Sequence, residues 1–358
     1  MLAIAACLAV LLCRAGAADA LGAYDPVSSG RTALRFDPQF LSVLKSNSVK
    51  VRGRQGAIFR AGVLSFPVDG GKFDPTTEGG TVEHGGAAAF ATPAASVPLK
   101  DLQLKTTRRS APLAARLGGG QLKLGRARSS SVQRDGFGDR ITVSKLALSA
   151  KAATRLSKRL HLRGAFQEGM SIGSAVTRVQ PETVAIEGKG RVSFDLDPGI
   201  AAKLNELHVA VNPIFPAEHP GSFTLAIFGG KLAPDLSSGR LETQGGLEFL
   251  QLGGGAVTWS DAAFDLSAGA LVPAVQVQPS PPYPGKLGEV PVAALGLPPG
   301  STSTDPPRRT LSISGATLAL SSAAAATFNE AFARPQERDD VFAAGDALGR
   351  VAVVAQAH

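Results

Sequence analysis

Residues 70–90 read GGKFDPTTEGGTVEHGGAAAF and residues 229–249 read GGKLAPDLSSGRLETQGGLEF, with eight of the twenty-one positions identical. Glycine-rich segments can cradle phosphate, but a P-loop needs Gly-Lys-Ser/Thr at the start of a helix. Here each glycine group is followed by alternating, strand-like residues. We therefore interpret the shared glycines as hairpin and bulge positions of one fold that occurs twice in the chain.

The match between the two stretches continues upstream. FDPQFLSVLKSNSVKV, from Phe36, corresponds to LDPGIAAKLNELHVAV, from Leu196. In each copy an aspartate, Asp37 or Asp197, precedes a proline, which is the pattern of a capped helix that begins with proline. Each copy is thus predicted to have a short helix that runs into an alternating strand.

The match also continues downstream. ITVSKLALSAKAATRLSKRL, from Ile141, corresponds to LSISGATLALSSAAAATFNEAF, from Leu311. Both segments predict a strand followed by a serine-capped helix with one apolar face. After each helix comes a glycine-punctuated strand, so the repeated unit extends over most of each half of the chain.

These patterns predict a mainly β protein with two tandem domains. Each domain is expected to be a β-sandwich-like or partly closed barrel structure with two short helices. We place the first domain at residues 31–189 and the second at 190–358, with a long proline-rich loop at 279–309. The boundary is expected near Gly188 and Gly190.

The N-terminus resembles an export signal. Residues 2–12 are apolar and are followed by small residues, so we predict a signal peptide at 1–20 and a linker at 21–30. A wrongly chosen start codon, or lipidation at Cys7, are the alternatives. Both cysteines, Cys7 and Cys13, lie in this segment, and no segment is long enough for a transmembrane helix. The expected location is secreted or associated with the cell surface.

Motifs for catalysis and metal binding are weak, and we expect no enzyme, no catalytic residue and no metal site. GMSIG matches the G-x-S-x-G pattern around Ser171, but it follows a helix and precedes a strand, the reverse of a nucleophile elbow, and the second copy has Ala347. The histidines lack metal-ligand spacing. His84, on the glycine motif, differs from Thr243 in the second copy and is the histidine of most interest.

Charge is the strongest functional signal. Residues 31–189 hold 26 Lys and Arg against 11 Asp and Glu, a net charge of +15, and residues 190–358 hold 10 against 16, a net charge of −6. The first domain is expected to meet an anionic envelope polymer, an acidic lipid or an acidic small molecule. Attraction between the two domains, or simple solubility, would also account for the split. Nucleic acid is disfavoured because stacking aromatics are few. The candidate ligand-binding residues are His84, Arg108, Arg109, Arg126, Arg128, Arg155, Lys158 and Arg159, with Lys151 on the same predicted helix face.

The order of motifs resembles a tandem pair of haem-transport-associated (HtaA-type) domains. The first copy offers FPVDGGKFDP, GTVEHGG and ITVSKLALSAKAATRL, and the second offers IFGGKLAP, GRLETQGG, AAFDLS and AAGDALGRV. The resemblance implies a β-sandwich-like module with two helices, displayed outside the membrane. It also implies, as the alternative function, a carrier for haem or another porphyrin. The family is similar to tyrosine-ligated haem carriers, whereas this chain has only Tyr24 and Tyr283, so His84 is the residue that could ligate iron. No cofactor is otherwise expected.

Overall fold

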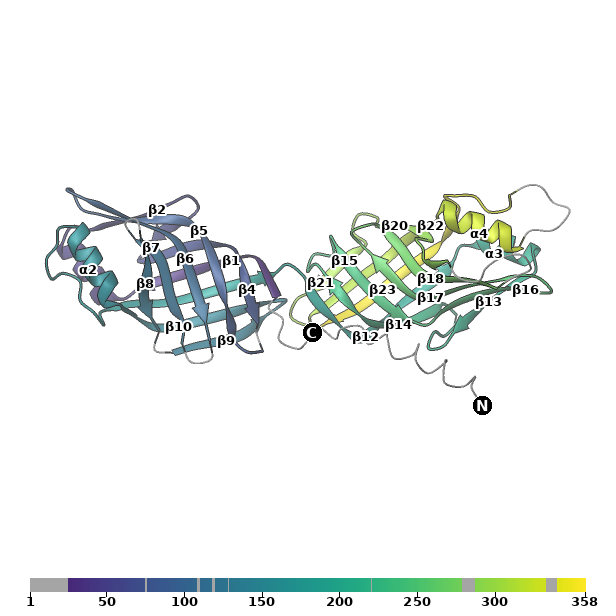
Figure 1. The fold of residues 1–358 in the computed structure, drawn as a ribbon, viewed down its shortest axis with the longest axis horizontal. Coiled ribbons are helices and arrows are strands. Elements are labelled where there is room, and N and C mark those ends of the chain that lie inside the picture. Colours follow the sequence, from purple (N-terminus) through teal and green to yellow (C-terminus); the bar gives the residue numbers. More distant parts are fainter. Residues whose placement is uncertain are drawn as a thin grey trace, which may run out of the picture. The chain divides into compact units, whose positions relative to one another are not determined.

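The computed structural model describes residues 25–358 apart from 75, 108–109, 118–119, 128, 220, 279–286 and 333–339. The predicted signal peptide, both cysteines and both tyrosines therefore lie outside the described residues. The chain divides into two compact units, the first ending at Glu182 and the second beginning at Thr183 (Figure 1). Strand β1 (Asp25–Phe36) already begins inside the predicted linker.

The boundary between the units differs from the predicted position at 189/190. Strand β12 (Val184–Leu196) runs across that position and pairs entirely within the second unit. Gly190 is a strand residue in this structure. Its φ is +120°, and a Cβ there would lie 2.2 Å from the carbonyl oxygen of Val354. The glycines of this stretch therefore allow close contact between strands and do not form a linker.

The described part of the first unit forms a closed ring of eight antiparallel strands. Of the two predicted architectures, a β-sandwich and a partly closed barrel, the barrel is therefore the one found. The ring closes because β11 pairs with β1, and β4 pairs with both β1 and β5. Its members, in order around the ring, are β1, β4 (Val63–Asp74), β5 (Gly79–Ala91), β6 (Ser96–Thr106), β7 (Pro112–Leu117), β8 (Gly120–Arg126), β10 (Gly138–Leu148) and β11 (Ser171–Pro181). Three short strands extend the sheet: β2 (Lys50–Arg54), β3 (Ile58–Arg60) and β9 (Ser129–Asp135).

The second unit repeats this ring with eight strands among the residues that the structure describes. The members are β12, β14 (Phe223–Leu232), β15 (Gly239–Gln244), β17 (Ala256–Asp265), β18 (Ala270–Gln278), β20 (Ala293–Gly296), β22 (Thr310–Leu320) and β23 (Ala347–Ala357). The additional strands are β13 (Val209–Ile214), β16 (Gly246–Gln251), β19 (Gly288–Glu289) and β21 (Thr302–Asp305). Residues 279–309 were predicted to be a loop, but their described part holds β19, β20 and β21, and the proline-free β20 completes the ring.

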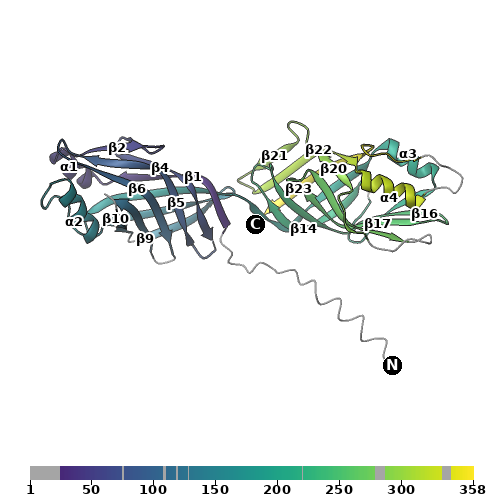
Figure 2. The same cartoon turned by 45° about the horizontal axis from the view of Figure 1, so that its top comes forward.

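Two short helices lie at one end of each barrel (Figure 2). They are α1 (Pro38–Ser46) and α2 (Ala150–Arg159) in the first unit, and α3 (Pro198–Glu206) and α4 (Ser322–Phe332) in the second. The predicted aspartate caps are confirmed: Asp37 Oδ1 accepts from the backbone N–H of Gln39 at 2.9 Å, and Asp197 Oδ1 from that of Gly199 at 2.8 Å. Serine caps are also present, at Ser149 for α2 and Ser321 for α4.

The glycines shared by the two copies have a structural reason. Gly86 and Gly245 have φ values of +79° and +84°, in the left-handed region that favours glycine. A Cβ on Gly86 would lie 2.8 Å from the backbone nitrogen of Ala57, and one on Gly245 would lie 2.7 Å from that of Ala217. The same contact in both units shows that the repeated motif encodes a bulge and a close backbone approach, as predicted.

The cores are aliphatic and aromatic, and the helices help to close them. In the first unit Phe36 contacts Phe40 of α1 and Phe90 of β5, with ring centroids 5.2 and 6.3 Å apart. In the second unit Phe328 of α4 stacks on Trp259, with centroids 5.3 Å apart. The helix-bearing end of each barrel is thus tied to its interior by aromatic contacts.

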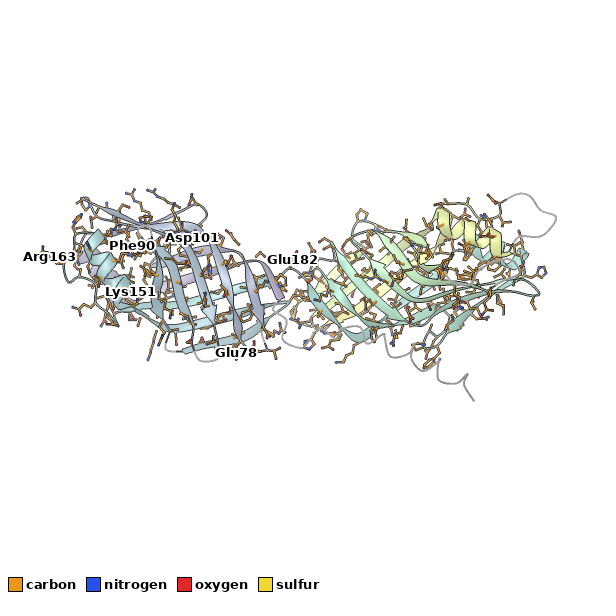
Figure 3. The ribbon with its side chains drawn as sticks, in the orientation of Figure 1. Glu78, Phe90, Asp101, Lys151, Arg163 and Glu182 are labelled. Carbon is orange, nitrogen blue, oxygen red and sulfur yellow. The ribbon has the colours of Figure 1, made fainter. Side chains whose placement is uncertain are left out.

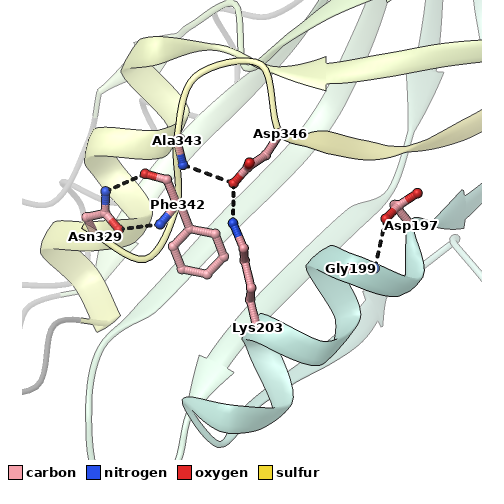
Figure 4. Close-up of polar contacts among 7 residues, drawn as sticks. All are labelled: Asp197, Gly199, Lys203, Asn329, Phe342, Ala343 and Asp346. Atoms are coloured by element: carbon pink, nitrogen blue, oxygen red, sulfur yellow. Dashed lines mark hydrogen bonds and ion pairs between the residues drawn. The ribbon is translucent and has the colours of Figure 1, made fainter. Parts of the chain in front are cut away.

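Polar contacts hold Phe342, Ala343 and Asp346 against α3 and α4 (Figure 4). The side chain of Asn329 pairs with the backbone of Phe342, donating to its oxygen at 2.8 Å and accepting from its nitrogen at 2.9 Å. Lys203 of α3 donates to Asp346 at 2.6 Å, and the backbone N–H of Ala343 donates to the same carboxylate oxygen at 2.9 Å. These bonds pair the charges of Lys203 and Asp346 with each other, so neither charge is available for binding a ligand.

No helix in the described chain combines the length and the apolar character needed to cross a membrane.

Candidate functional site

Helix α2 presents a row of cations to solvent. Its apolar residues Ala152, Ala153 and Leu156 are buried against the barrel, so its polar face must point outward. Lys151, Lys158 and Arg159 are exposed on that face and Arg155 is half-buried, a set that repeats the face predicted from the sequence. Figure 3 labels Lys151 at the helix-bearing end of the first unit.

A surface depression of about 700 Å³ lies between α2 and β8, and we call it the α2–β8 groove. Four of its lining residues are cations and none is a carboxylate. The full lining is Gln121, Leu122, Ala150, Lys151, Thr154, Arg155, Lys158 and Arg159. Uncompensated positive charge around a concave surface raises the local concentration of anions, so this groove is suited to an acidic ligand.

Arg155 has a structural role in the groove. Its Nη1 donates to the carbonyl oxygens of Leu117 and Gly120, at 3.3 and 3.1 Å, which ties α2 to the hairpin of β7 and β8. Its charge still lies at the groove, but part of its donor set is already used. Arg155 therefore positions the wall of the groove as well as contributing charge.

The other three cations of the groove have no ion pair within the described residues. Elsewhere in this unit arginines are matched with aspartates: Arg116 lies 3.2 Å from Asp101, and Arg140 and Arg178 each lie 3.1 Å from Asp135. The latter pairs lower the pKa of Asp135, with the hydrogen bond from Arg140 as the main cause. Several sheet arginines of this unit are thus paired with aspartates, whereas Lys151, Lys158 and Arg159 of α2 have no such pair within the described residues.

Helix electrostatics explain only part of this charge pattern. Lys158 and Arg159 lie in the last turn of α2, where a cation interacts favourably with the helix dipole. Lys151 lies in the first turn, where the same dipole is repulsive to a cation. Helix stability alone would therefore not favour Lys151, and a function in ligand binding would account for it.

The second unit provides a matched comparison. Aligning the caps Ser149 and Ser321 places Leu156 opposite Phe328, and both are buried. The positions of Lys151, Arg155, Lys158 and Arg159 are then occupied in α4 by Ala323, Thr327, Glu330 and Ala331. The same helix on the same fold has lost four cations and gained an acid, so the fold does not require the charges.

A second depression, of about 760 Å³, lies on the other flank of α2, and we call it the α2–loop depression. It combines apolar groups with a histidine and cations, and it also contains one carboxylate. Its lining residues are Ala150, Ala153, Thr154, Ser157, Lys158, His161, Arg163, Gly164, Phe166 and Glu168. Lys158 lines both depressions.

His84 is buried in the core of the first barrel and does not form part of its surface. It is 6% exposed. Its Nδ1 lies 2.9 Å from the carbonyl oxygen of Leu102 and must donate to it, because a carbonyl only accepts. Its Nε2 then accepts from the Thr32 hydroxyl at 2.5 Å, and Thr32 lies 2.7 Å from the Thr177 hydroxyl. Both ring nitrogens are thus satisfied by the barrel.

The remaining candidate residues are not gathered at the groove. Arg126 is exposed at the end of β8 but does not line the groove, and Arg108, Arg109 and Arg128 lie outside the described residues. The structure therefore brings together Arg155, Lys158 and Arg159 with Lys151. Sequence reasoning missed Thr154, which lies on α2 itself, and Gln121, which joins the groove because β8 and α2 meet through a long-range contact that no local pattern reveals.

No catalytic grouping is found among the described residues. The Ser171 hydroxyl donates to Asp37 Oδ2 at 3.1 Å, and that carboxylate is already the cap of α1, so the serine supports a helix end. No set of three or more His, Cys, Asp or Glu side chains within the described ranges is placed to hold a metal ion.

Comparisons with known proteins give distant structural likenesses only. No family model and no curated protein matches the sequence. The C-terminal domain of HtaA from Corynebacterium glutamicum is similar at 12% identity and a TM-score of 0.37, covering 43% of this chain and 98% of that one. Its N-terminal domain matches at 15% identity and 0.29, covering 43% and 98%. The heme binding protein HtaB of the same organism matches at 11% and 0.29, covering 44% and 96%.

Proposed function

We propose that this chain is an exported, non-enzymatic binding protein whose first unit holds an anionic ligand in the α2–β8 groove. The observation that carries the proposal is the groove itself: four cations line it, no carboxylate does, and three of the cations have no ion pair within the described residues. Export rests on the N-terminal sequence. Absence of catalysis rests on the placement of Ser171.

The ligand class follows from the chemistry of the lining. Lysine and arginine with a threonine hydroxyl and a glutamine amide recognise phosphate or carboxylate groups. No aromatic side chain lines the groove, so stacking of nucleic-acid bases has no support there. An anionic envelope polymer, an acidic lipid headgroup and an acidic small molecule share the required chemistry.

The proposal is tested with a variant that gives α2 the residues of α4. Lys151→Ala, Lys158→Glu and Arg159→Ala are combined in the full chain, leaving Arg155 to hold the hairpin. Three probes distinguish the sources: pyrophosphate, a poly(glycerol phosphate) oligomer, and phosphatidylglycerol vesicles. We expect at least about a tenfold loss of affinity at low salt for the probes that bind. Adding Glu330→Lys of α4 to this variant restores two of its four lost units of charge without changing the groove, and it should not restore affinity. Unchanged affinity of the α2 variant for every probe would refute the proposal.

A haem or porphyrin carrier is the second candidate, and one observation favours it. The α2–loop depression places His161 beside the apolar Phe166 and Ala153, with Lys158 and Arg163 available for carboxylates. Bound haem would supply an iron centre there, and His161 is the residue that fits as its ligand. His84 does not fit, because both of its nitrogens are bonded in the core.

Titration of the full chain with haemin tests the second candidate. A carrier of this kind is expected to give a shifted Soret band that His161→Ala abolishes and His84→Thr leaves in place. No shift, or a shift that survives His161→Ala, would remove the site from consideration. Lys151→Ala combined with Arg159→Ala separates the two candidates, because neither residue lines the α2–loop depression and a loss of pyrophosphate binding is independent of iron ligation.

A further inference from the structure

Strand β2 carries a second, separate set of cations. Lys50, Arg52 and Arg54 alternate along it with Val51 and Gly53, so the three charged side chains lie on one face of the sheet. All three are exposed, and none has an ion pair within the described part of the chain. We call them the β2 row. Their spacing along the strand is about 6.6 to 6.8 Å from one cation to the next.

The β2 row is supported by a line of alanines on the neighbouring strand. Lys50 pairs with Ala91, Arg52 with Ala89 and Arg54 with Ala87. Residues directly opposite each other in a sheet point to the same face. Ala88 and Phe90 belong to the core, so Ala87 and Ala89 lie on the outer face, yet they are only 3% and 6% exposed.

Neighbouring side chains must therefore cover these outer-face alanines. The long apolar stems of Arg52 and Arg54, directly opposite, are suited to do so while their charged ends stay in water. Packing of this kind restricts the stems before any ligand arrives. Binding then costs less side-chain entropy than it would for freely moving surface arginines.

The far side of the alanine line adds charge of the same sign. Strand β6 places Ser96, Pro98 and Lys100 opposite Ala91, Ala89 and Ala87. Lys100 is exposed and is thus a fourth cation flanking the line. The next residue, Asp101, is a carboxylate beside these register positions, and it is held by Arg116 at 3.2 Å. The line of alanines is thus flanked by cations on both sides, the β2 row on one side and Lys100 on the other.

The second unit shows that the fold does not need this row. Ser48 and His208 occupy the same position before the two strands, with φ values of +53° and +55°. From that alignment, Lys50, Arg52 and Arg54 correspond to Ala210, Asn212 and Ile214. Opposite Asn212 stands Glu248, which accepts from its amide at 3.4 Å. The equivalent strip has no cation and one acid.

We infer that the β2 row is a binding surface for a linear polyanion, with successive charges of the polymer meeting successive cations of the strand. The inference shares with the proposed function the premise that the first unit meets an anion, but it concerns a different surface. Even spacing along a line favours a chain-like ligand. A lipid surface would be helped by apolar anchors, and Ile58 is the only large apolar side chain exposed in the described part of this unit.

Charges on an edge strand can also serve to prevent association through that edge. The β2 row differs from a purely protective pattern because Lys100 continues the charge on the next strand but one, away from the edge. This distinction can be measured. A protective row predicts that its removal causes self-association and leaves binding intact.

The test uses the full chain with Lys50→Ala, Arg52→Asn and Arg54→Ile, which installs the residues of β13. A second variant, with glutamine at all three positions, keeps the stems and serves if the first does not fold. Poly(glycerol phosphate) oligomers of increasing length are the probe, and glycerol phosphate is the monomeric control. We expect affinity of the unaltered protein to rise with oligomer length, and at least about a tenfold loss for the longest oligomer in the variant.

The α2 variant is measured in parallel, so that the two surfaces are judged separately. Loss in the β2 variant with no loss in the α2 variant would uphold this inference and would show that the α2–β8 groove does not bind this polymer. Equal affinity of the β2 variant and the unaltered protein for the longest oligomer would overturn the inference. So would a loss confined to phosphatidylglycerol vesicles, which would assign the row to a lipid surface, or self-association with binding retained.

Discussion

His84 shows how one position can differ between the copies for internal reasons. Its partner Thr32, and Thr177, which bonds to Thr32, correspond to Val192 and Val353 in the second unit, which pair in the same way. Thr243 stands in the place of His84 and donates to the carbonyl of Ala262 at 2.8 Å. The first barrel therefore contains a buried polar cluster where the second has valines and one threonine.

We predict that this cluster makes the first unit sensitive to mild acid. Burial lowers the pKa of His84 below its ordinary value of 6.5, and this outweighs the opposing effects of the Leu102 carbonyl and the Asp69 carboxylate. The folded state therefore binds the proton less readily than the unfolded state. Stability is fully present above pH 6.5 and is lost as the pH falls through that value toward the folded pKa.

Denaturant unfolding between pH 7.5 and pH 5 checks this prediction, with the triple variant Thr32→Val, His84→Thr and Thr177→Val as the control. The variant carries the residues of the second unit at these positions and should lose less stability over this range. His84→Ala alone should cost about 1–3 kcal/mol, because it leaves buried polar groups without partners. Identical pH profiles for the unaltered chain and the triple variant would contradict the assignment.

At the scale of elements, the copies share their turns and caps more closely than their surfaces. Sequence reasoning predicted the aspartate and serine caps because each depends on residues within three positions. It left open a sandwich or a partly closed barrel, because closure depends on β1 meeting β11 and β12 meeting β23, far apart in the chain. The domain boundary was misplaced since Gly190 reads as a linker residue until its strand partner is known.

The same limit applies to the candidate site. The basic face of α2 follows from helical periodicity and was predicted correctly as a face. The groove that this face forms with Gln121 depends on tertiary contacts. So do the bonds from Arg155 to the β7–β8 hairpin. His84 was considered as an iron ligand, but it lies on the long strand β5, whose alternation places that side chain inward.

We predict that Gly86 is essential to the junction of β2 and β5. Gly86→Ala should lower the free energy of unfolding by more than the roughly 1–2 kcal/mol expected for an alanine in the left-handed region. The added Cβ would also collide with the backbone of Ala57. Gly169→Ala is the matched control. The φ of Gly169, +77°, is similar, and apart from its chain neighbours no atom lies within 4 Å of the added Cβ.

Thermal or denaturant unfolding of the two glycine variants checks this prediction. A larger loss for Gly86→Ala than for Gly169→Ala supports the role of close backbone approach. Equal losses would show that the backbone conformation alone explains why glycine recurs at this position of the repeated motif.

At the scale of the whole molecule, the two units share one fold and differ in the side chains that they expose. Caps, bulge glycines and buried helix faces recur, whereas α2 and β2 carry cations that α4 and β13 lack. These cations account for part of the difference between the net charges of the sequence halves, +15 and −6. We attribute this divergence to binding of an anion by the first unit, with the α2–β8 groove as its main site.

The most direct test is the salt dependence of binding. Affinity for the anionic probe that binds best in the three-probe titration is measured across a range of salt concentrations, for the unaltered chain and for the variant Lys151→Ala, Lys158→Glu and Arg159→Ala. Displacement of salt ions by contacts between ligand and protein makes the logarithm of affinity fall with the logarithm of salt concentration. We predict a steep slope for the unaltered chain and a clearly shallower one for the variant. Equal slopes, or binding that salt does not weaken, would contradict the account.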